Sequence, residues 1–168
     1  MKIELWTGAD LDQLADVLHA CVHAGASVSF VLPFSKDEAI AFWRDQVLPA
    51  VNAGTRGVFI ARADGRIVGT VQLDLSTPPN QPHRAEVKKL LVHPDARRRG
   101  IARSLMNAAH DHARAAHRTL LTLDTAVGSL AEPLYLSLGY VPIGVIPRYS
   151  FNFNSTVLEG TTVMYKDL

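Results

Sequence analysis

The stretch Leu90-Leu91-Val92-His93-Pro94-Asp95-Ala96-Arg97-Arg98-Arg99-Gly100-Ile101-Ala102-Arg103 decides the fold of this chain. It is typical of an apolar strand that ends at a proline turn and is followed by a basic, glycine-bearing entry into a helix. The first N–H groups of a helix have no partner within the helix, and the aligned peptide dipoles add partial positive charge at that end. Three arginines at this position oppose the helix dipole unless an anion binds there. The stretch therefore predicts a phosphate-binding loop.

The remaining sequence predicts an α/β fold built on a mixed sheet. A hairpin is expected around Ala63-Asp64-Gly65, Thr7 or Asp10 can cap the first helix, and Ser35 and Glu38 form a capping box for the second. Because hairpins are combined with one strand–helix–strand crossover, only the strands at that crossover should be parallel. We expect a single domain, residues 1–168, of about seven strands and four helices. The expected strands are 3–5, 58–63, 66–75, 86–92, 120–125, 140–146 and 161–166, and the expected helices are 7–24, 35–53, 98–117 and 130–138.

Bulk composition excludes several classes of function. The 17 Lys and Arg residues nearly balance the 16 Asp and Glu residues, so the arginine run is local and nucleic acid is not expected as a partner. The N-terminus lacks an apolar targeting core, and nowhere do 18 apolar residues run together, so we expect no membrane association and a cytoplasmic location. Cys21 is the only cysteine, which excludes an internal disulfide and favours a buried, unreactive thiol.

The histidines do not predict a metal site. His19 and His23 share one helical face, and His110, His112 and His117 lie on another predicted helix. Neither set has a third ligand at metal spacing, so we expect ordinary solvated or partly buried imidazoles and no bound metal.

Two motifs resemble the GCN5-related N-acetyltransferase (GNAT) family. Arg97-Arg98-Arg99-Gly100-Ile101-Ala102 is similar to its cofactor signature, and the segment 131–140, which contains Tyr135, is similar to its second signature. The short segments Gly25-Ala26-Ser27-Val28, Arg84-Ala85-Glu86-Val87, Leu123-Asp124-Thr125 and Gly128-Ser129 look closest to the tabtoxin-resistance acetyltransferases of this family. One departure is Gly128, which stands where the family usually has an asparagine that contacts the pantetheine arm.

The resemblance implies acetyl-CoA as the co-substrate. Its pyrophosphate would lie against the backbone N–H groups of the phosphate-binding loop, where Gly100 permits close approach. Its pantetheine amides would pair with the backbone of the preceding strand. The implied cofactor-binding residues are Leu90, Leu91, Val92, Arg97, Arg98, Arg99, Gly100, Ile101, Ala102 and Arg103.

The resemblance also implies three catalytic residues. Glu86, eleven positions before Arg97, matches the general base of the histone acetyltransferases, and Asp124 matches a second acidic residue of the tabtoxin-resistance enzymes. A carboxylate of pKa about 4 cannot deprotonate an ammonium outright, so burial or a bridging water must assist, and Asp124 can instead hold the ammonium. Tyr135 matches the general acid, and the oxyanion donor would be a backbone N–H near Leu91. The structural alternatives are a Glu86–Lys88 pair, a turn acceptor at Asp124 and a packing role for Tyr135.

We therefore expect an acetyl-CoA-dependent N-acetyltransferase whose partner is a small-molecule amine. The resemblance favours an amino acid or an amino-acid-like antibiotic or toxin, with antibiotic resistance as one implied role and with Ser27, Phe30 and Tyr149 as walls of the acceptor site. Two alternatives stay open: acetylation of a protein or peptide amine, and a non-catalytic sensor that binds acyl-CoA.

Overall fold

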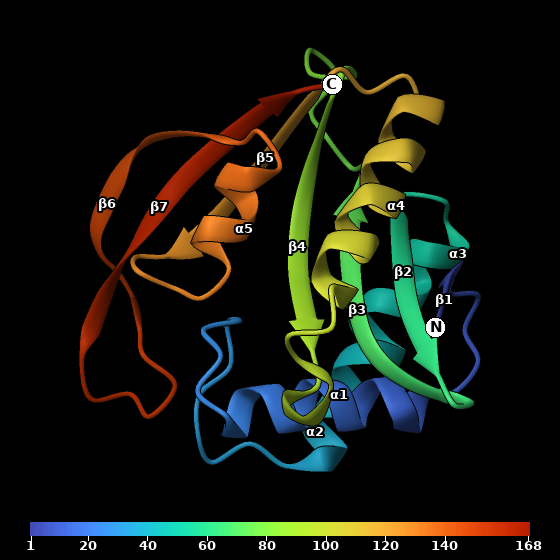
Figure 1. Cartoon of the computed structure of the whole chain (residues 1–168), viewed down its shortest axis with the longest axis vertical. Helices are drawn as coiled ribbons and strands as arrows, with labels where there is room; N and C mark the ends of the chain where they lie inside the picture. Colours follow the sequence, from blue (N-terminus) through green and yellow to red (C-terminus); the bar gives the residue numbers. More distant parts are fainter.

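The computed structural model describes all 168 residues, and one seven-stranded sheet runs through it (Figure 1). The strands lie in the order β1-β2-β3-β4-β5-β7-β6. All neighbours are antiparallel except β4 and β5, so the prediction of a mixed sheet with one parallel pair is confirmed. The strands are β1 Lys2–Leu5, β2 Arg56–Ala63, β3 Arg66–Asp74, β4 Arg84–Val92, β5 Leu120–Ala126, β6 Val141–Phe151 and β7 Leu158–Asp167.

Four helical segments accompany the sheet, as predicted. The second is a continuous run in which a π-helical turn joins two short α-helices, and a 3-10 turn precedes the third. None of the helices combines the length and apolar character that a membrane-spanning segment requires. The segments are α1 Leu11–His23, then α2 Lys36–Ala41 with η1 Phe42–Val47 and α3 Leu48–Asn52, then η2 Pro94–Ala96 with α4 Ile101–Ala115, and finally α5 Glu132–Ser137.

The predicted side-chain cap is present in the second helix and absent from the first. The capping box is confirmed, because the Glu38 N–H donates to Ser35 Oγ at 3.2 Å and the Ser35 N–H donates to Glu38 Oε2 at 2.7 Å. Neither candidate cap of the first helix acts through its side chain. Asp10 stands at the N-cap of α1 in a left-handed conformation, and its carboxylate accepts instead from Arg62 Nη2 at 2.9 Å.

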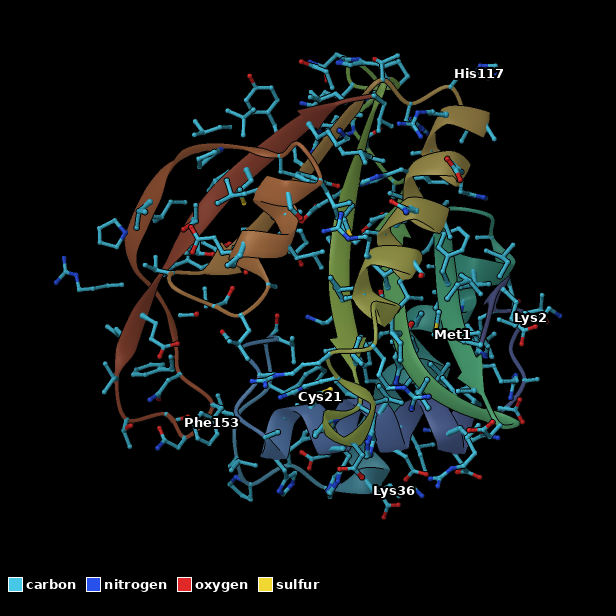
Figure 2. All side chains as sticks on the ribbon, in the orientation of Figure 1. Met1, Lys2, Cys21, Lys36, His117 and Phe153 are labelled. Atoms are coloured by element: carbon cyan, nitrogen blue, oxygen red, sulfur yellow. The ribbon has the colours of Figure 1, made fainter.

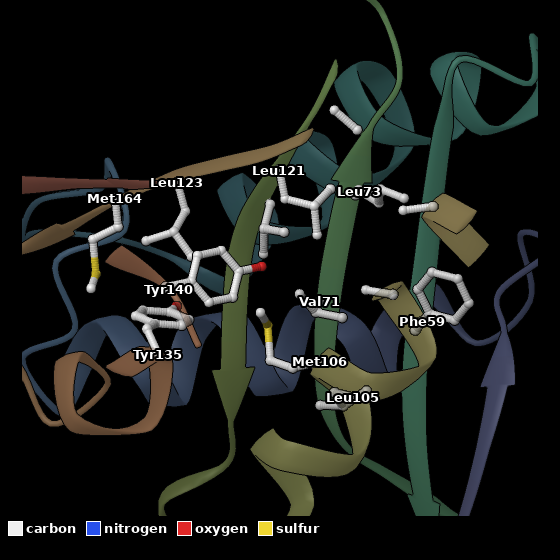
Figure 3. Close-up of a cluster of buried hydrophobic side chains, with 14 of the residues drawn as sticks. Phe59, Val71, Leu73, Leu105, Met106, Leu121, Leu123, Tyr135, Tyr140 and Met164 are labelled. Carbon is white, nitrogen blue, oxygen red and sulfur yellow. The ribbon is translucent and has the colours of Figure 1, made fainter. Parts of the chain in front are cut away.

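The sheet separates two hydrophobic cores. On one face α4 and α5 cover a core that includes Leu105, Met106, Leu121 and Tyr135 (Figure 3). On the other face α1 and the α2–α3 segment enclose a core around Trp43. Since β3 and β4 contact helices on both faces, their side chains are held firmly enough to fix the polar groups that these two strands carry.

The parallel strands β4 and β5 stay paired over only three residues. Arg84–Glu86 lies beside Leu120–Thr122, and beyond that point the strands diverge, as Figure 1 shows. From Val87 onward, the edge of β4 that faces β5 therefore has no strand partner. An unpaired strand edge inside a fold exposes backbone donors and acceptors to a ligand.

Several element boundaries differ from the sequence prediction, and the first helix, for example, begins at Leu11 rather than Thr7. Helix α4 begins at Ile101 rather than Arg98, because Arg98 and Gly100 adopt left-handed conformations with φ of 61° and 75°. The final hairpin is longer than predicted, since β6 continues to Phe151 and β7 already begins at Leu158. The pairing of β6 is irregular between Ile146 and Ser150, where Pro147 interrupts the apolar alternation, so the sequence pattern ended the strand too early.

Candidate active site

A β-bulge interrupts β4 in the middle of the sheet. Gln72 of β3 lies opposite Lys88 and Thr70 lies opposite Leu91, so Lys89 and Leu90 together face one residue of β3. Lys89 has φ of 51°, a left-handed conformation that is unusual for a residue with a side chain. The extra residue reverses the alternation of β4. The strand consequently contributes to the α4 core before the bulge, and at Leu91 to the α1 core after it.

The residues expected to line the pantetheine arm lie on the unpaired part of β4. Leu91 and Val92 pair with β3 on their other side, where Gly69 is packed so closely that a methyl group would come within 2.9 Å of the Leu91 carbonyl oxygen. The Val92 carbonyl already accepts from Cys21 Sγ at 3.3 Å and Arg97 Nε at 3.4 Å. Burial raises the pKa of the Cys21 thiol, which favours the predicted structural role.

The loop between η2 and α4 presents a row of free backbone donors. The Arg97 N–H donates to the Pro94 carbonyl at 3.3 Å, but the N–H groups from Arg98 to Arg103 have no acceptor in the chain. A methyl group added at Gly100 would meet no atom within 4 Å, so the loop is open on that side. These donors, at the positive end of a fifteen-residue helix, fit a phosphate-bearing ligand.

The arginine side chains of this loop divide into two groups. Arg98 and Arg99 are exposed and make no hydrogen bond or ion pair within the chain. Arg103 donates to Ser137 Oγ at 2.8 Å and so ties α4 to α5. Two cations therefore remain free to meet an anion that binds at the loop.

The two predicted carboxylates lie on the same face of the sheet. Glu86 stands beside Thr122 on β5, and Asp124 follows two residues later on the same face. The Glu86 carboxylate is partly exposed and pairs with Lys88 Nζ at 3.2 Å, as the structural alternative expected. The Asp124 carboxylate accepts from Thr161 Oγ1 at 2.8 Å.

Asp74 and two basic residues form an ionic network next to Glu86. Asp74 lies opposite Glu86 on β3 and accepts from both Lys88 Nζ and Arg56 Nη2 at 3.0 Å. Burial alone would raise the pKa of Asp74, but hydrogen bonds from Lys88 and the Ser76 N–H, together with the charge of Arg56, outweigh it and lower the pKa. Asp74 therefore stays ionised and holds Lys88 in place whether or not Glu86 binds a proton.

Tyr135 brings a hydroxyl without a protein partner to the opposite face. It is 7% exposed, its ring lies 5.7 Å from that of Tyr140, and its hydroxyl makes no hydrogen bond within the chain (Figure 3). The Tyr140 hydroxyl, in contrast, pairs with His110 Nε2 at 3.0 Å. Burial, and secondly the charge of Asp124, raises the pKa of Tyr135 well above its usual range. The phenol thus stays protonated, as a proton donor must.

Residues of the predicted acceptor wall are brought together only in part. Phe30 packs against Phe34 and Phe42, with ring centroids 4.7 and 5.1 Å apart, beside a surface hollow of about 460 Å³. Ser27 is exposed and makes no side-chain hydrogen bond, and Tyr149 is 54% exposed on an irregular part of β6. The α1–α2 loop that carries Ser27 and Phe30 thus contributes one well-packed aromatic wall.

This loop also contacts the tip of the β6–β7 hairpin. The Leu32 N–H donates to the Phe153 carbonyl at 2.7 Å, and the Phe153 ring lies against Gly25. Figure 2 labels Phe153 at the hairpin tip, next to the loop at the open end of the divergence between β4 and β5. Two segments far apart in sequence therefore bound the same end of the site.

The histidines lie outside this arrangement. His19 and His23 stack on each other with ring centroids 4.2 Å apart, and His23 Nε2 pairs with the Phe34 carbonyl at 2.9 Å. No group of three or more His, Cys, Asp or Glu side chains has the geometry to hold a metal ion.

Lys89 is the site residue that the sequence interpretation missed. Its Nζ donates to Ser29 Oγ at 2.9 Å and lies 5.6 Å from the centre of the Phe30 ring, so it joins the bulge to the acceptor loop. The pair Lys88-Lys89 indicates that this strand departs from strict alternation, because a regular strand would turn one of the two lysines toward the core. The sequence does not show that the departure is a bulge, or that the bulge turns both lysines toward the site.

Comparisons with known proteins agree with this geometry. Residues 54–142 match the family model described as an acetyltransferase (GNAT) domain. The chain is 30% identical over 134 residues to an uncharacterized N-acetyltransferase of the hisH–hisA intergenic region of Azospirillum brasilense, which covers 79% of this chain and 77% of that protein. The chain belongs to the GNAT acetyltransferase family. It is an acetyl-CoA-dependent N-acetyltransferase.

Solved structures show the same fold. A ribosomal-protein-alanine N-acetyltransferase from Brucella melitensis superposes with a TM-score of 0.84 at 22% identity, over 100% of both chains. The acetyltransferase YncA from Salmonella typhimurium, solved with acetyl-CoA, superposes with a TM-score of 0.82 at 19% identity, over 100% of this chain and 94% of that chain.

Proposed function

We propose that this enzyme acetylates a small amine of the amino-acid type by direct transfer from acetyl-CoA, with Glu86, Asp124 and Tyr135 as its catalytic residues. The observation that carries the proposal is the convergence of these three groups where β4 and β5 part. Asp124 is close enough for its charge to raise the pKa of Tyr135, although the two side chains come from different elements. A base and an acid on either side of one gap are what acyl transfer to an amine requires.

Acetyl-CoA, when bound, supplies the thioester whose acetyl group is transferred. Backbone N–H groups from Arg98 to Arg103 would hold its pyrophosphate, and the free edge of β4 at Leu90–Val92 would hold its pantetheine arm. A backbone N–H near Leu91 would donate to the carbonyl oxygen as negative charge develops there.

The protons are handled by the chain. Glu86, directly or through a water, accepts one proton from the ammonium that Asp124 holds, which frees the nitrogen lone pair to attack the acetyl carbon. The nitrogen loses its second proton after the C–N bond has formed, and this proton restores the phenol of Tyr135 once the tyrosine has protonated the sulfur. As the C–S bond breaks, Tyr135 donates its proton to the sulfur. The raised pKa of Tyr135 makes this donation less favourable in isolation, but the same low-polarity surroundings also raise the pKa of the departing thiol.

A small acceptor is favoured over a protein chain by the contact between the α1–α2 loop and the β6–β7 hairpin. The Leu32–Phe153 hydrogen bond and the packing of Gly25 on Phe153 narrow the end of the site at which an extended peptide would enter. The resemblance to tabtoxin-resistance acetyltransferases points the same way, toward an amino-acid-like antibiotic or toxin.

A thiol-release screen with acetyl-CoA tests the proposal. The candidate acceptors are free amino acids, amino-acid antimetabolites, amine antibiotics and peptides with free N-termini. We expect CoA release with amino-acid-type amines. Exclusive turnover of peptides would instead favour a protein or peptide acceptor, and binding of acetyl-CoA without turnover of any amine would favour a non-catalytic sensor.

The base is tested with Glu86→Gln. Its removal leaves Lys88 paired with Asp74, so the fold should be unaffected, whereas turnover should fall by about 100-fold with unchanged acetyl-CoA affinity. Glu159→Gln, on β7 and without an ion pair, is the matched control. Unchanged turnover in Glu86→Gln would remove Glu86 as the base.

A further inference from the structure

Lys89 is a cation without a counterion in the interior of the site. The neighbouring Lys88 pairs with Asp74 at 3.0 Å and with Glu86 at 3.2 Å, and Arg56 also pairs with Asp74. Lys89 makes no ion pair, and its one hydrogen bond is to the neutral Ser29 hydroxyl. Asp74 and Glu86 on this face thus already have cationic partners, whereas Asp124 has none.

The surroundings of Lys89 disfavour the protonated form of its ammonium group. Burial, and secondly the charge of Lys88, lowers the pKa of Lys89 from 10.5 to about 8, although Asp124 acts in the opposite direction. At neutral pH Lys89 is still mostly protonated. A desolvated cation with two unused N–H groups gains free energy from an anion that enters the site.

The position of Lys89 shows where that anion would lie. Its backbone forms the bulge next to the strand edge at Leu90–Val92, and its ammonium reaches the α1–α2 loop at Ser29 and Phe30. Asp124 is near enough to act electrostatically on both Lys89 and Tyr135. A cation and an anion thus lie in the part of the site where the function proposed above places the amine.

We propose that Lys89 is a specificity-determining residue that binds the carboxylate of the acceptor, while Asp124 binds its ammonium, so that the site selects zwitterionic amino acids. This rests on the function proposed above and adds to it the group that distinguishes an amino acid from a simple amine. The phenyl face of Phe30 and the Ser29 hydroxyl fix the direction of the Lys89 side chain before the acceptor arrives.

The test pairs each amino acid that the screen finds with its amide and its methyl ester. In the wild-type enzyme kcat/KM should be about 10- to 100-fold higher for the free acid. Lys89→Met, which keeps the length of the side chain, should abolish this preference, and Lys89→Arg should restore part of it. Lys36→Met, on the exposed surface of α2, is the control and should retain the full preference.

A second readout separates the two proposals. Binding of a panel of N-acetyl amino acids and their amides, with CoA present, is measured by calorimetry, and acetyl-CoA affinity reports the integrity of the fold. If the wild-type enzyme prefers the carboxylates and Lys89→Met does not, the carboxylate-binding role of Lys89 is supported even when no amine is turned over. Equal binding of acids and amides, or no binding of the acids, overturns the carboxylate-binding role of Lys89. Turnover of amines without a carboxylate at the same rate also overturns this role, but it leaves the acetyltransferase activity intact.

Discussion

Replacement of Gly100 by alanine separates phosphate binding from stability. Gly100 has φ of 75°, and a methyl group there would meet no atom of the chain within 4 Å. Alanine therefore costs only the left-handed conformation, about 1–2 kcal/mol of unfolding free energy. For a chain of this size, each kcal/mol lowers Tm by roughly 2–4 °C.

The chain contains a matched control for this change. Gly54 follows α3 with φ of 70°, and a methyl group there also meets nothing within 4 Å. Gly54→Ala should lower Tm by the same few degrees, because the backbone conformation is the same. It lies far along the chain from the loop and should leave acetyl-CoA binding unchanged.

The two variants should differ in cofactor affinity. The methyl group of Gly100→Ala projects to the open side of the loop, where it keeps the pyrophosphate from the N–H groups of Arg98–Arg103. Each lost contact at an exposed helix N-terminus is worth about 0.3–1 kcal/mol, so losing two or three weakens binding by about 3- to 150-fold. Calorimetry with acetyl-CoA measures this directly. Equal affinities in the two variants would refute the assignment of the loop.

Three other predictions follow from the same contacts. Tyr135→Phe should lower turnover by at least about 10-fold without loss of stability, since its hydroxyl has no partner, whereas Tyr140→Phe breaks the bond to His110 and should destabilise the fold by about 1 kcal/mol; thermal melts and steady-state kinetics distinguish them. Burial, with the charges of Lys166 and Arg114, lowers the pKa of His110 to about 4, so stability should fall as the pH drops from about 6.5 toward 4, and urea unfolding should show a weaker decline in His110→Gln. Gly69→Ala should destabilise the sheet and weaken acetyl-CoA binding together, because its methyl group would come within 2.9 Å of the Leu91 carbonyl oxygen, and a melt and a binding curve from one preparation check this.

The sequence was sufficient for most of the fold because its local signals agree with the tertiary structure. The capping box at Ser35, the hairpin at Asp64-Gly65 and the single crossover around β4 and β5 are each visible in short stretches of residues. The final hairpin was predicted too short, because Pro147 and the irregular pairing between Ile146 and Ser150 interrupt β6 before its end.

The site was predictable where function needs a particular residue type and not where it needs an irregular backbone. Glu86, Asp124 and Tyr135 were proposed from the resemblance, which needs only residue types at fixed spacings, and their roles stay predictions. Lys89 was missed, since its role arises from a bulge and from a loop about sixty residues earlier in the chain. The free hydroxyl of Tyr135 likewise became visible only beside the satisfied hydroxyl of Tyr140.

The bulge in β4 has a consequence for how this sheet tolerates change. Deleting Lys89 would restore an even ladder with β3 and keep Leu91 opposite Thr70, so the side chains that follow would stay on their present faces. The strand should therefore tolerate the loss of one residue at the bulge without a change in either hydrophobic core. What such a deletion would remove is the ammonium beside Ser29 and Phe30, so the bulge serves to place this one lysine rather than to shape the core.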